Sequence, residues 1–136
     1  MTKLIRTAFI SVTLGFSFAS VVAVEQAVAG RFEDGKSAYD RKDYATALKD
    51  FRIAAKAGDA RAMNGLGVMY GSGGSGLPED RVRGYMWLSL AVELGSSDDA
   101  AGNLAFVAKG MTPSQITQAK AMAAQCQSSR YTDCGE

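Results

Sequence analysis

From Arg31 onward, apolar side chains recur at spacings of three and four residues, and no stretch alternates apolar with polar residues over the length of a strand. Spacings of three and four gather side chains on one face of an α-helix, whereas a half-buried strand needs a period of two. Gly58, Gly95 and the glycine-rich residues 71–76 interrupt this pattern. The sequence therefore predicts an all-α domain over residues 30–136.

Six segments carry the helical pattern, and short connections join them into about three helical hairpins. The predicted helices span residues 31–41, 43–57, 60–71, 80–95, 98–109 and 112–126. The last of them has the clearest start, because Thr112 at the N-cap, Pro113 at the first helical position and Gln115 at the third form a capping-box arrangement.

The second and fourth predicted helices match each other at an offset of 37 residues. Small and large residues recur together, in the pairs Ala47/Gly84, Phe51/Leu88, Ala54/Ala91, Ala55/Val92 and Gly58/Gly95. The third and fifth match less closely at an offset of 38, where Ala62, Leu66 and Gly67 fall on Ala100, Leu104 and Ala105. A repeated hairpin that buries its apolar stripe on the next one predicts a short α-solenoid.

The N-terminus has the pattern of a secretory signal peptide. Lys3 and Arg6 precede a chargeless run over residues 7–24, and a small-x-small pattern follows at Ala27-Val28-Ala29. We expect cleavage before Gly30, so that residues 1–29 are removed and residues 30–136 form an exported, periplasmic or secreted protein without stable membrane insertion. The alternative is an uncleaved anchor helix, because the apolar run just reaches the length that spans a bilayer.

Composition excludes several classes of function. The chain has 15 Lys and Arg against 14 Asp and Glu, so it offers no strongly basic surface for nucleic acid. It has no histidine, which removes Ser-His and Cys-His nucleophile pairs, the usual zinc sites and the commonest general base near neutral pH. We therefore expect a protein that is not an enzyme and that uses no cofactor or metal.

Cys126 and Cys134 are the two cysteines, and both lie near the C-terminus. An oxidising compartment favours a disulfide between them, which would stabilise the chain by about 2–3 kcal/mol by restraining the tail. The alternative, a redox-active pair, usually has Cys-x-x-Cys spacing at a helix start, which this chain lacks.

Three further motifs have both a functional and a structural interpretation. Gly71-x-Gly73-x2-Gly76 matches the dinucleotide fingerprint, but it follows a predicted helix instead of a strand, which favours a flexible loop. The acidic pairs Glu79-Asp80 and Asp98-Asp99 could serve acid/base chemistry or metal binding. Each pair lies at a predicted helix start, however, where carboxylates accept hydrogen bonds from the unpaired backbone N–H groups and so cap the helix. Trp87 with Tyr85 could stack on a sugar, but we expect Trp87 in the core.

The centre of the chain resembles one full Sel1-like repeat, a relative of the tetratricopeptide repeat. The resemblance rests on Ala62-x3-Leu66-Gly67-x2-Tyr70-x2-Gly73, on Gly76-Leu77-Pro78-x-Asp80, and on Tyr85-x-Trp87-Leu88-x2-Ala91-Val92-x2-Gly95. Residues 32–58 are similar to the looser hairpin that often precedes such a repeat, and residues 98–134 resemble a degenerate capping repeat of exported bacterial members. A glycine at position 84, where the family usually has alanine, is expected to soften the centre of the stack.

The resemblance implies a protein-protein interaction adaptor that binds a protein or peptide through a helical surface. The candidate residues are Arg61, Asn64 and Val68, which share a face of the third predicted helix, and Asn103 on the fifth. The alternative for these side chains is an ordinary solvated face. At the level of the whole protein, the alternatives are an envelope enzyme or enzyme activator acting on peptidoglycan or polysaccharide, and a structural homo-oligomer.

Overall fold

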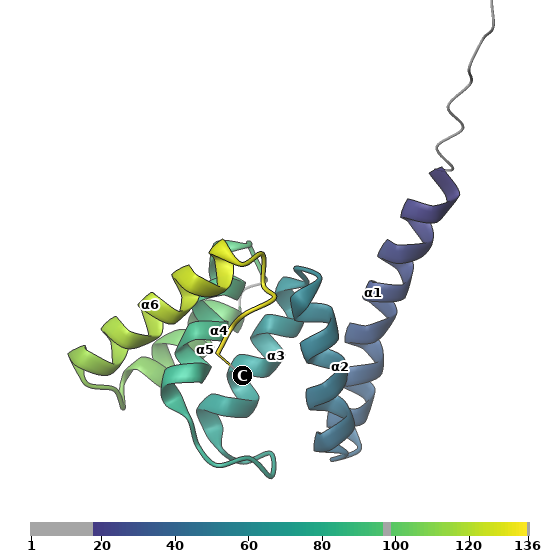
Figure 1. Ribbon diagram of the computed structural model, residues 1–136. Coiled ribbons are helices and arrows are strands. Elements are labelled where there is room, and N and C mark those ends of the chain that lie inside the picture. The colour runs from purple at the N-terminus through teal and green to yellow at the C-terminus, as the bar shows by residue number, and fades with distance from the viewer. Residues whose placement is uncertain (1–17, 97–98, 136) are drawn as a thin grey trace, which may run out of the picture.

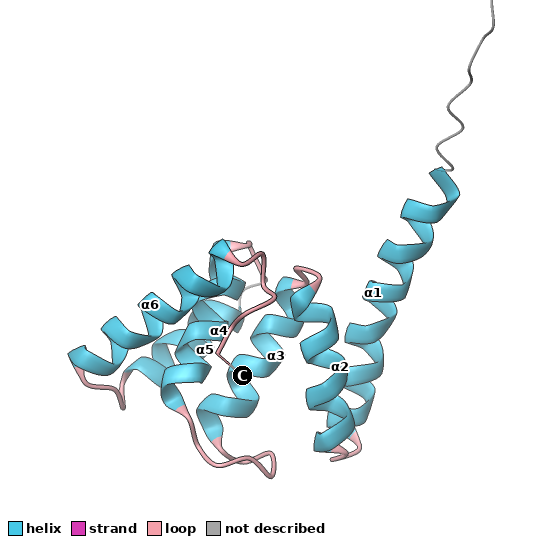
Figure 2. Cartoon of the chain, viewed as in Figure 1, coloured by secondary structure: helices cyan, strands magenta, loops and turns pink. Residues whose placement is uncertain are grey.

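The computed structural model describes residues 18–96 and 99–135, and in this part of the chain all regular secondary structure is α-helical (Figures 1 and 2). The prediction of an all-α domain is confirmed. The helices are α1 (Phe18–Asp40), α2 (Tyr44–Lys56), α3 (Ala60–Ser72), α4 (Arg81–Glu93), α5 (Asp99–Ala108) and α6 (Pro113–Ser128).

The first helix differs most from its predicted bounds. It begins at Phe18 instead of residue 31, and it continues through the expected cleavage site before Gly30. No proline interrupts this segment, and its many alanines favour the helix, so the backbone continues without a break. Gln26, Ala27 and Gly30 are exposed, whereas Arg31 is the first residue of α1 with a described side-chain contact to the body. Residues 1–17 lie outside the described part.

The helices α2, α4 and α6 end in the same way. The amide N–H of Asp59 donates to the carbonyl of Ala54 (3.0 Å), that of Ser96 to Ala91 (2.9 Å) and that of Tyr131 to Cys126 (2.8 Å). In each turn the preceding residue, Gly58, Gly95 or Arg130, has a positive φ, as a Schellman ending requires. The first two endings therefore repeat at the offset seen in the sequence, and α6 has the same ending with an arginine in place of the glycine.

These three helices also begin with side-chain caps. Asp43 accepts a hydrogen bond from the Thr46 amide (3.3 Å), and Asp80 accepts one from the Arg83 amide (2.9 Å). At α6, the Thr112 hydroxyl accepts from the amide of Gln115 (3.2 Å), whose side-chain oxygen accepts from the Thr112 amide (2.9 Å). The capping box predicted there is confirmed.

Each helix packs on its neighbour along the chain from α1 to α5, and α6 packs on α4. The buried core contains Phe51, Met63, Leu66 and Leu90, together with Trp87, which is only 1% exposed. Since burial of large apolar side chains is the main favourable contribution to folding, these residues hold the helices together. The assignment of Trp87 to the core is confirmed.

Glycines allow α3 and α4 to cross with their backbones in close contact. A Cβ atom added at Gly84 would lie 2.6 Å from the Cα of Gly71 and 3.0 Å from the carbonyl oxygen of Gly67. The expectation that Gly84 softens the centre is wrong, because the missing side chain is what permits the close crossing.

The C-terminal tail is closed by a disulfide between Cys126 and Cys134, as predicted. Both cysteines are buried in the core cluster, and Figure 1 shows the yellow tail turning back from α6 toward α2 and α3. The Tyr131 ring lies beside the turn between α2 and α3, where a Cβ atom added at Gly58 would be 3.9 Å from it. The tail therefore joins the last helix to the first hairpin.

Candidate functional site

A surface groove of about 390 Å³ lies along α1 and α3 and reaches the start of α5. We call it the α1–α3 groove. Its lining residues are Phe32, Lys36, Tyr39, Phe51, Arg61, Asn64, Gly65, Val68, Ser96 and Asp99. Three of the four residues predicted to bind a partner, Arg61, Asn64 and Val68, are therefore brought together in one groove.

Aromatic side chains form the α1 side of the groove. The Phe32 ring lies 5.8 Å from the Phe51 ring between centroids, and the Tyr39 ring lies 5.4 Å from that of Tyr44. Both Phe32 and Tyr39 are half-buried against the core. A half-buried ring keeps part of its apolar surface exposed. Phe32 and Tyr39 therefore both pack against the core and offer apolar surface in the groove.

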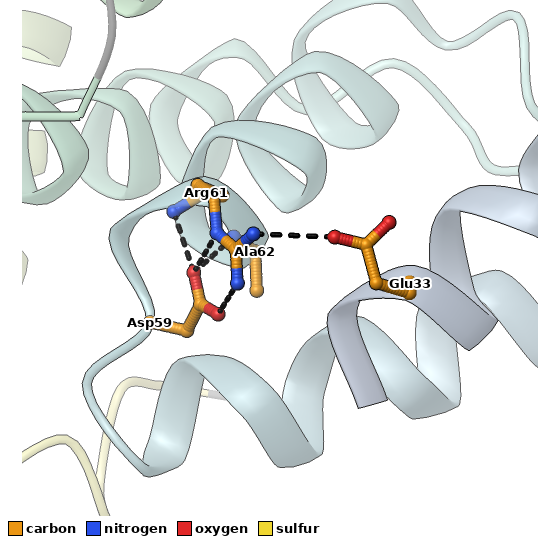
Figure 3. A network of polar contacts seen from close by, with 4 residues as sticks. All are labelled: Glu33, Asp59, Arg61 and Ala62. Carbon is orange, nitrogen blue, oxygen red and sulfur yellow. Dashed lines mark hydrogen bonds and ion pairs between the residues drawn. The ribbon is translucent and has the colours of Figure 1, made fainter. Parts of the chain in front are cut away.

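Arg61 connects α1 to the start of α3 (Figure 3). Its guanidinium donates to both carboxylate oxygens of Asp59 (2.8 and 3.2 Å) and to Glu33 on α1 (3.2 Å), and its Cζ lies 4.2 Å from the centroid of the Phe32 ring. Asp59 also caps α3 by accepting from the amides of Arg61 and Ala62. The hydrogen bond to Asp59 holds the pKa of Arg61 above its ordinary value. Arg61 thus fixes the shape of the groove at one end.

Asn64 and Asn103 form an amide pair across α3 and α5. Nδ2 of Asn103 donates to Oδ1 of Asn64 at 3.1 Å, and both side chains are partly exposed. This bond uses one donor and one acceptor of the pair, whereas two primary amides carry four donor hydrogens and two acceptor oxygens. The pair therefore presents further donors and an acceptor to a ligand beside the groove.

Val68 extends the groove toward α5. It also lines a smaller pocket of about 150 Å³, together with Asn103, Val107 and Phe106. Phe106 is 63% exposed, the largest exposed fraction among the large apolar side chains that the structure describes. Phe106 is not among the residues predicted from the sequence, although its position one turn after Asn103 on the same helix is a usable signal.

The charges near the α1–α3 groove are largely compensated within the chain. Lys36 donates to Asp40 at 2.9 Å, and this hydrogen bond raises the pKa of Lys36 above its ordinary value. Arg61 is paired with Asp59 and Glu33 as described above. The groove therefore offers aromatic surface and amide hydrogen-bonding groups more than uncompensated charge.

The acidic and glycine-rich motifs have structural roles where the structure describes them. Asp80 caps α4, Glu79 pairs with Arg81, and Asp99 lies in the first turn of α5, whereas Asp98 is outside the described residues. Gly71 still belongs to α3, and Gly73 ends this helix in the left-handed conformation, so the fingerprint lies on a helix end and a loop. Within the described residues, no three Cys, Asp or Glu side chains are grouped closely enough to hold a metal ion.

The search for related proteins finds no match. No protein-family model, no curated protein and no solved structure matches this chain. Among the described helices, none is long and apolar enough to cross a membrane.

Proposed function

We propose that the protein is an exported, non-enzymatic adaptor of the Sel1-like type, a short α-solenoid that binds a segment of a partner protein in the α1–α3 groove. The proposal rests on one observation: side chains from α1 and α3 line the same groove, namely Phe32, Tyr39, Asn64 and Val68. The hydrogen-bonded pair of Asn64 and Asn103 lies beside it. Primary amides can both donate to and accept from a peptide backbone, and half-buried rings and Val68 offer apolar contact for side chains.

A polypeptide ligand fits this groove better than a highly charged one. The basic side chains Lys36 and Arg61 both have acidic partners in the chain, so a polyanion would have to displace existing ion pairs. Extended peptide segments combine backbone hydrogen bonds with small apolar pockets for alternate side chains. The pocket beside Phe106 and Val68 is of a size for one such side chain.

The repeat interpretation is supported by the shared caps and endings of α2, α4 and α6. A solenoid is built from units that each contact only their neighbours, and the first helices of successive hairpins then line one face. Here those first helices are α1, α3 and α5, which supply most of the lining of the groove and its extension, with Phe51 of α2, Leu88 of α4 and Ser96 completing it.

Export is supported by the position at which α1 joins the body. The described contacts of α1 begin at Arg31, whose guanidinium donates to the buried Asp50 at 3.2 Å, so cleavage before Gly30 would keep them all. The buried disulfide suits an oxidising compartment. N-terminal sequencing of the protein from the exported fraction of its host tests this: we expect Gly30 first, and a chain that keeps Met1 would contradict it.

Co-purification from the host tests the adaptor function. The tagged protein is cross-linked in living cells, recovered from the exported fraction and compared with the variant Asn64→Ala/Val68→Ser. Arg61 is left in place, because its removal would also break the contacts that fix α1 to α3. We expect a discrete partner that the variant loses while its melting temperature stays within a few degrees of the original.

The matched control is Lys49→Ala/Ile53→Ser, which makes the same kind of changes at the same spacing on exposed positions of α2 outside the groove. This control should retain the partner. Recovery of cross-links only between copies of this chain, unchanged in either variant, would contradict the adaptor function and support a structural oligomer.

A further inference from the structure

The two ends of the α1–α3 groove differ in character. The helices α3 and α5 run in the same direction, because the amide pair joins them one turn after they begin and a Cβ atom added at Gly71, near the end of α3, would lie 2.6 Å from Val107, near the end of α5. Asp99, in the first turn of α5, therefore lies at the same end of the groove as Arg61, in the first turn of α3. We call this the Arg61 end.

The carboxylates at the Arg61 end outnumber the cations. Figure 3 shows the Arg61 guanidinium between two carboxylates, those of Asp59 at 2.8 Å and Glu33 at 3.2 Å. Asp99 is exposed and lines the groove, and its side chain has no hydrogen-bond or ion-pair partner among residues 18–96 and 99–135. One cation thus stands against three carboxylates, which leaves two negative charges in excess at this end.

The aromatic wall of the groove also suits a cation. The Cζ atom of Arg61 lies 4.2 Å from the centroid of the Phe32 ring, so a cation of the chain itself already packs on this wall. The face of an aromatic ring is negative and attracts a cation. Tyr39 is the second half-buried ring of the wall, and no cation from the described part of the chain lies over it.

The opposite end of the groove is apolar. Val68 opens there into the pocket of about 150 Å³ beside Phe106, and the lining of this pocket has no charged residue. A ligand that spans the groove therefore meets negative charge at one end and apolar surface at the other. A polypeptide segment with one basic and one apolar side chain has this polarity.

The remaining charge of the lining does not neutralise the Arg61 end. Lys36, the other cation of the groove, is paired with Asp40 at 2.9 Å. A metal ion is a poor occupant, because no three acidic side chains in the described residues are grouped closely enough to hold one. The methylene stem of a lysine or arginine, in contrast, can pack on the rings while its charged head remains in water.

We propose that the α1–α3 groove selects a partner segment with a basic side chain, whose charged head lies beside Asp99 at the Arg61 end. An apolar side chain of the same segment lies in the pocket beside Phe106. This inference rests on the proposed function, because it requires that the groove binds a polypeptide. It adds the chemistry by which the partner is recognised.

Three blocked peptides that differ at one position test the proposal. They have the sequence acetyl-Ala-Leu-Ala-X-Ala-amide, where X is lysine, glutamine or glutamate. Each is titrated into the full exported chain at physiological ionic strength, and NMR shifts of the Asn64 and Val68 backbone amides report occupancy of the groove. We expect the lysine peptide to bind about threefold more tightly than the glutamine peptide, and the glutamate peptide to bind most weakly.

The variant Asp99→Asn assigns this preference to the Arg61 end. It should weaken binding of the lysine peptide about threefold and leave binding of the glutamine peptide unchanged, so the glutamine peptide also shows that the groove is intact. The matched control is Asp34→Asn, which makes the same change in net charge at an exposed position on the side of α1 that faces away from Phe32. The control should change binding of the lysine peptide by less than about 1.5-fold, because exposed charges at a distance are screened.

Four outcomes would overturn the proposal. Equal binding of the three peptides, with shifts at Asn64 and Val68, would remove the preference for a basic segment and leave the adaptor function standing. Equal losses in both aspartate variants would show attraction by net charge alone. Binding of propylamine as tight as that of the lysine peptide would assign the Arg61 end to a small cation. No shift with any peptide would also contradict the inference, whereas cross-linking in the host decides separately on the adaptor function.

Discussion

Single glycines set how closely the helices of this protein approach each other. At the crossing of α3 and α4, a side chain at Gly84 would collide with backbone atoms of α3. A side chain at Gly67 would collide with the Leu88 side chain of α4, and one at Gly71 with the Val107 side chain of α5. Gly102 on α5 is different, because nothing lies within 4 Å of a Cβ atom added there. The same residue type therefore has opposite consequences at two positions.

Gly84→Ala should lower the free energy of unfolding by about 1–3 kcal/mol, because α3 and α4 must move apart to accept the methyl group. Gly102→Ala should raise it by about 0.5–1 kcal/mol, since alanine is the better helix former in an open position. Urea denaturation of both variants measures these changes. A Gly84→Ala variant as stable as the original protein would mean that the close crossing is not essential.

A titratable cap, Asp43, makes the start of α2 sensitive to acid. Hydrogen bonds from the side chain and amide of Thr46 lower the pKa of Asp43 below its ordinary value of 3.8. The ionised carboxylate is thus favoured in the folded state, so its contribution is present above 3.8 and is lost as the pH falls through the lower folded value.

Asp43→Asn should remove this pH dependence at the start of α2, because an amide can cap the helix but does not titrate in this range. The measurement is an acid titration of the Thr46 amide signal by NMR. We expect a transition centred below 3.8 in the original chain and a flat profile in the variant. A transition of the same size in both proteins would assign it to another group.

The helices and caps were predictable from the sequence because they depend on local signals. Thr112 and Gln115 specify the start of α6, and Gly58 and Gly95 specify two turns. Arg130 was not predictable as a turn residue, because a positive φ at a non-glycine residue has no signal in the sequence. In the site, Arg61, Asn64 and Val68 were predicted, but the contact of Asn64 with Asn103 and the exposure of Phe106 follow from how the hairpins pack.

At the scale of the whole molecule, the disulfide-closed tail connects α6 with the turn between α2 and α3. Replacing Cys126 and Cys134 by serine should lower the free energy of unfolding by about 2–3 kcal/mol. It should also speed amide hydrogen exchange in residues 129–135 and at Gly58, which lies beside Tyr131. Reducing agent should reproduce the loss in the original chain and leave the double-serine variant unchanged. A loss confined to the tail, with no change at Gly58, would show that the tail does not support the first hairpin.

The most direct test of the central claim compares two positions on this molecule in its host. A photo-cross-linking amino acid is placed at position 68, inside the α1–α3 groove, or at position 53, an exposed apolar position on α2 outside it. The adaptor function predicts one discrete adduct with a partner protein from position 68 and none from position 53. Equal adducts from both positions, or no adduct from position 68, would contradict it.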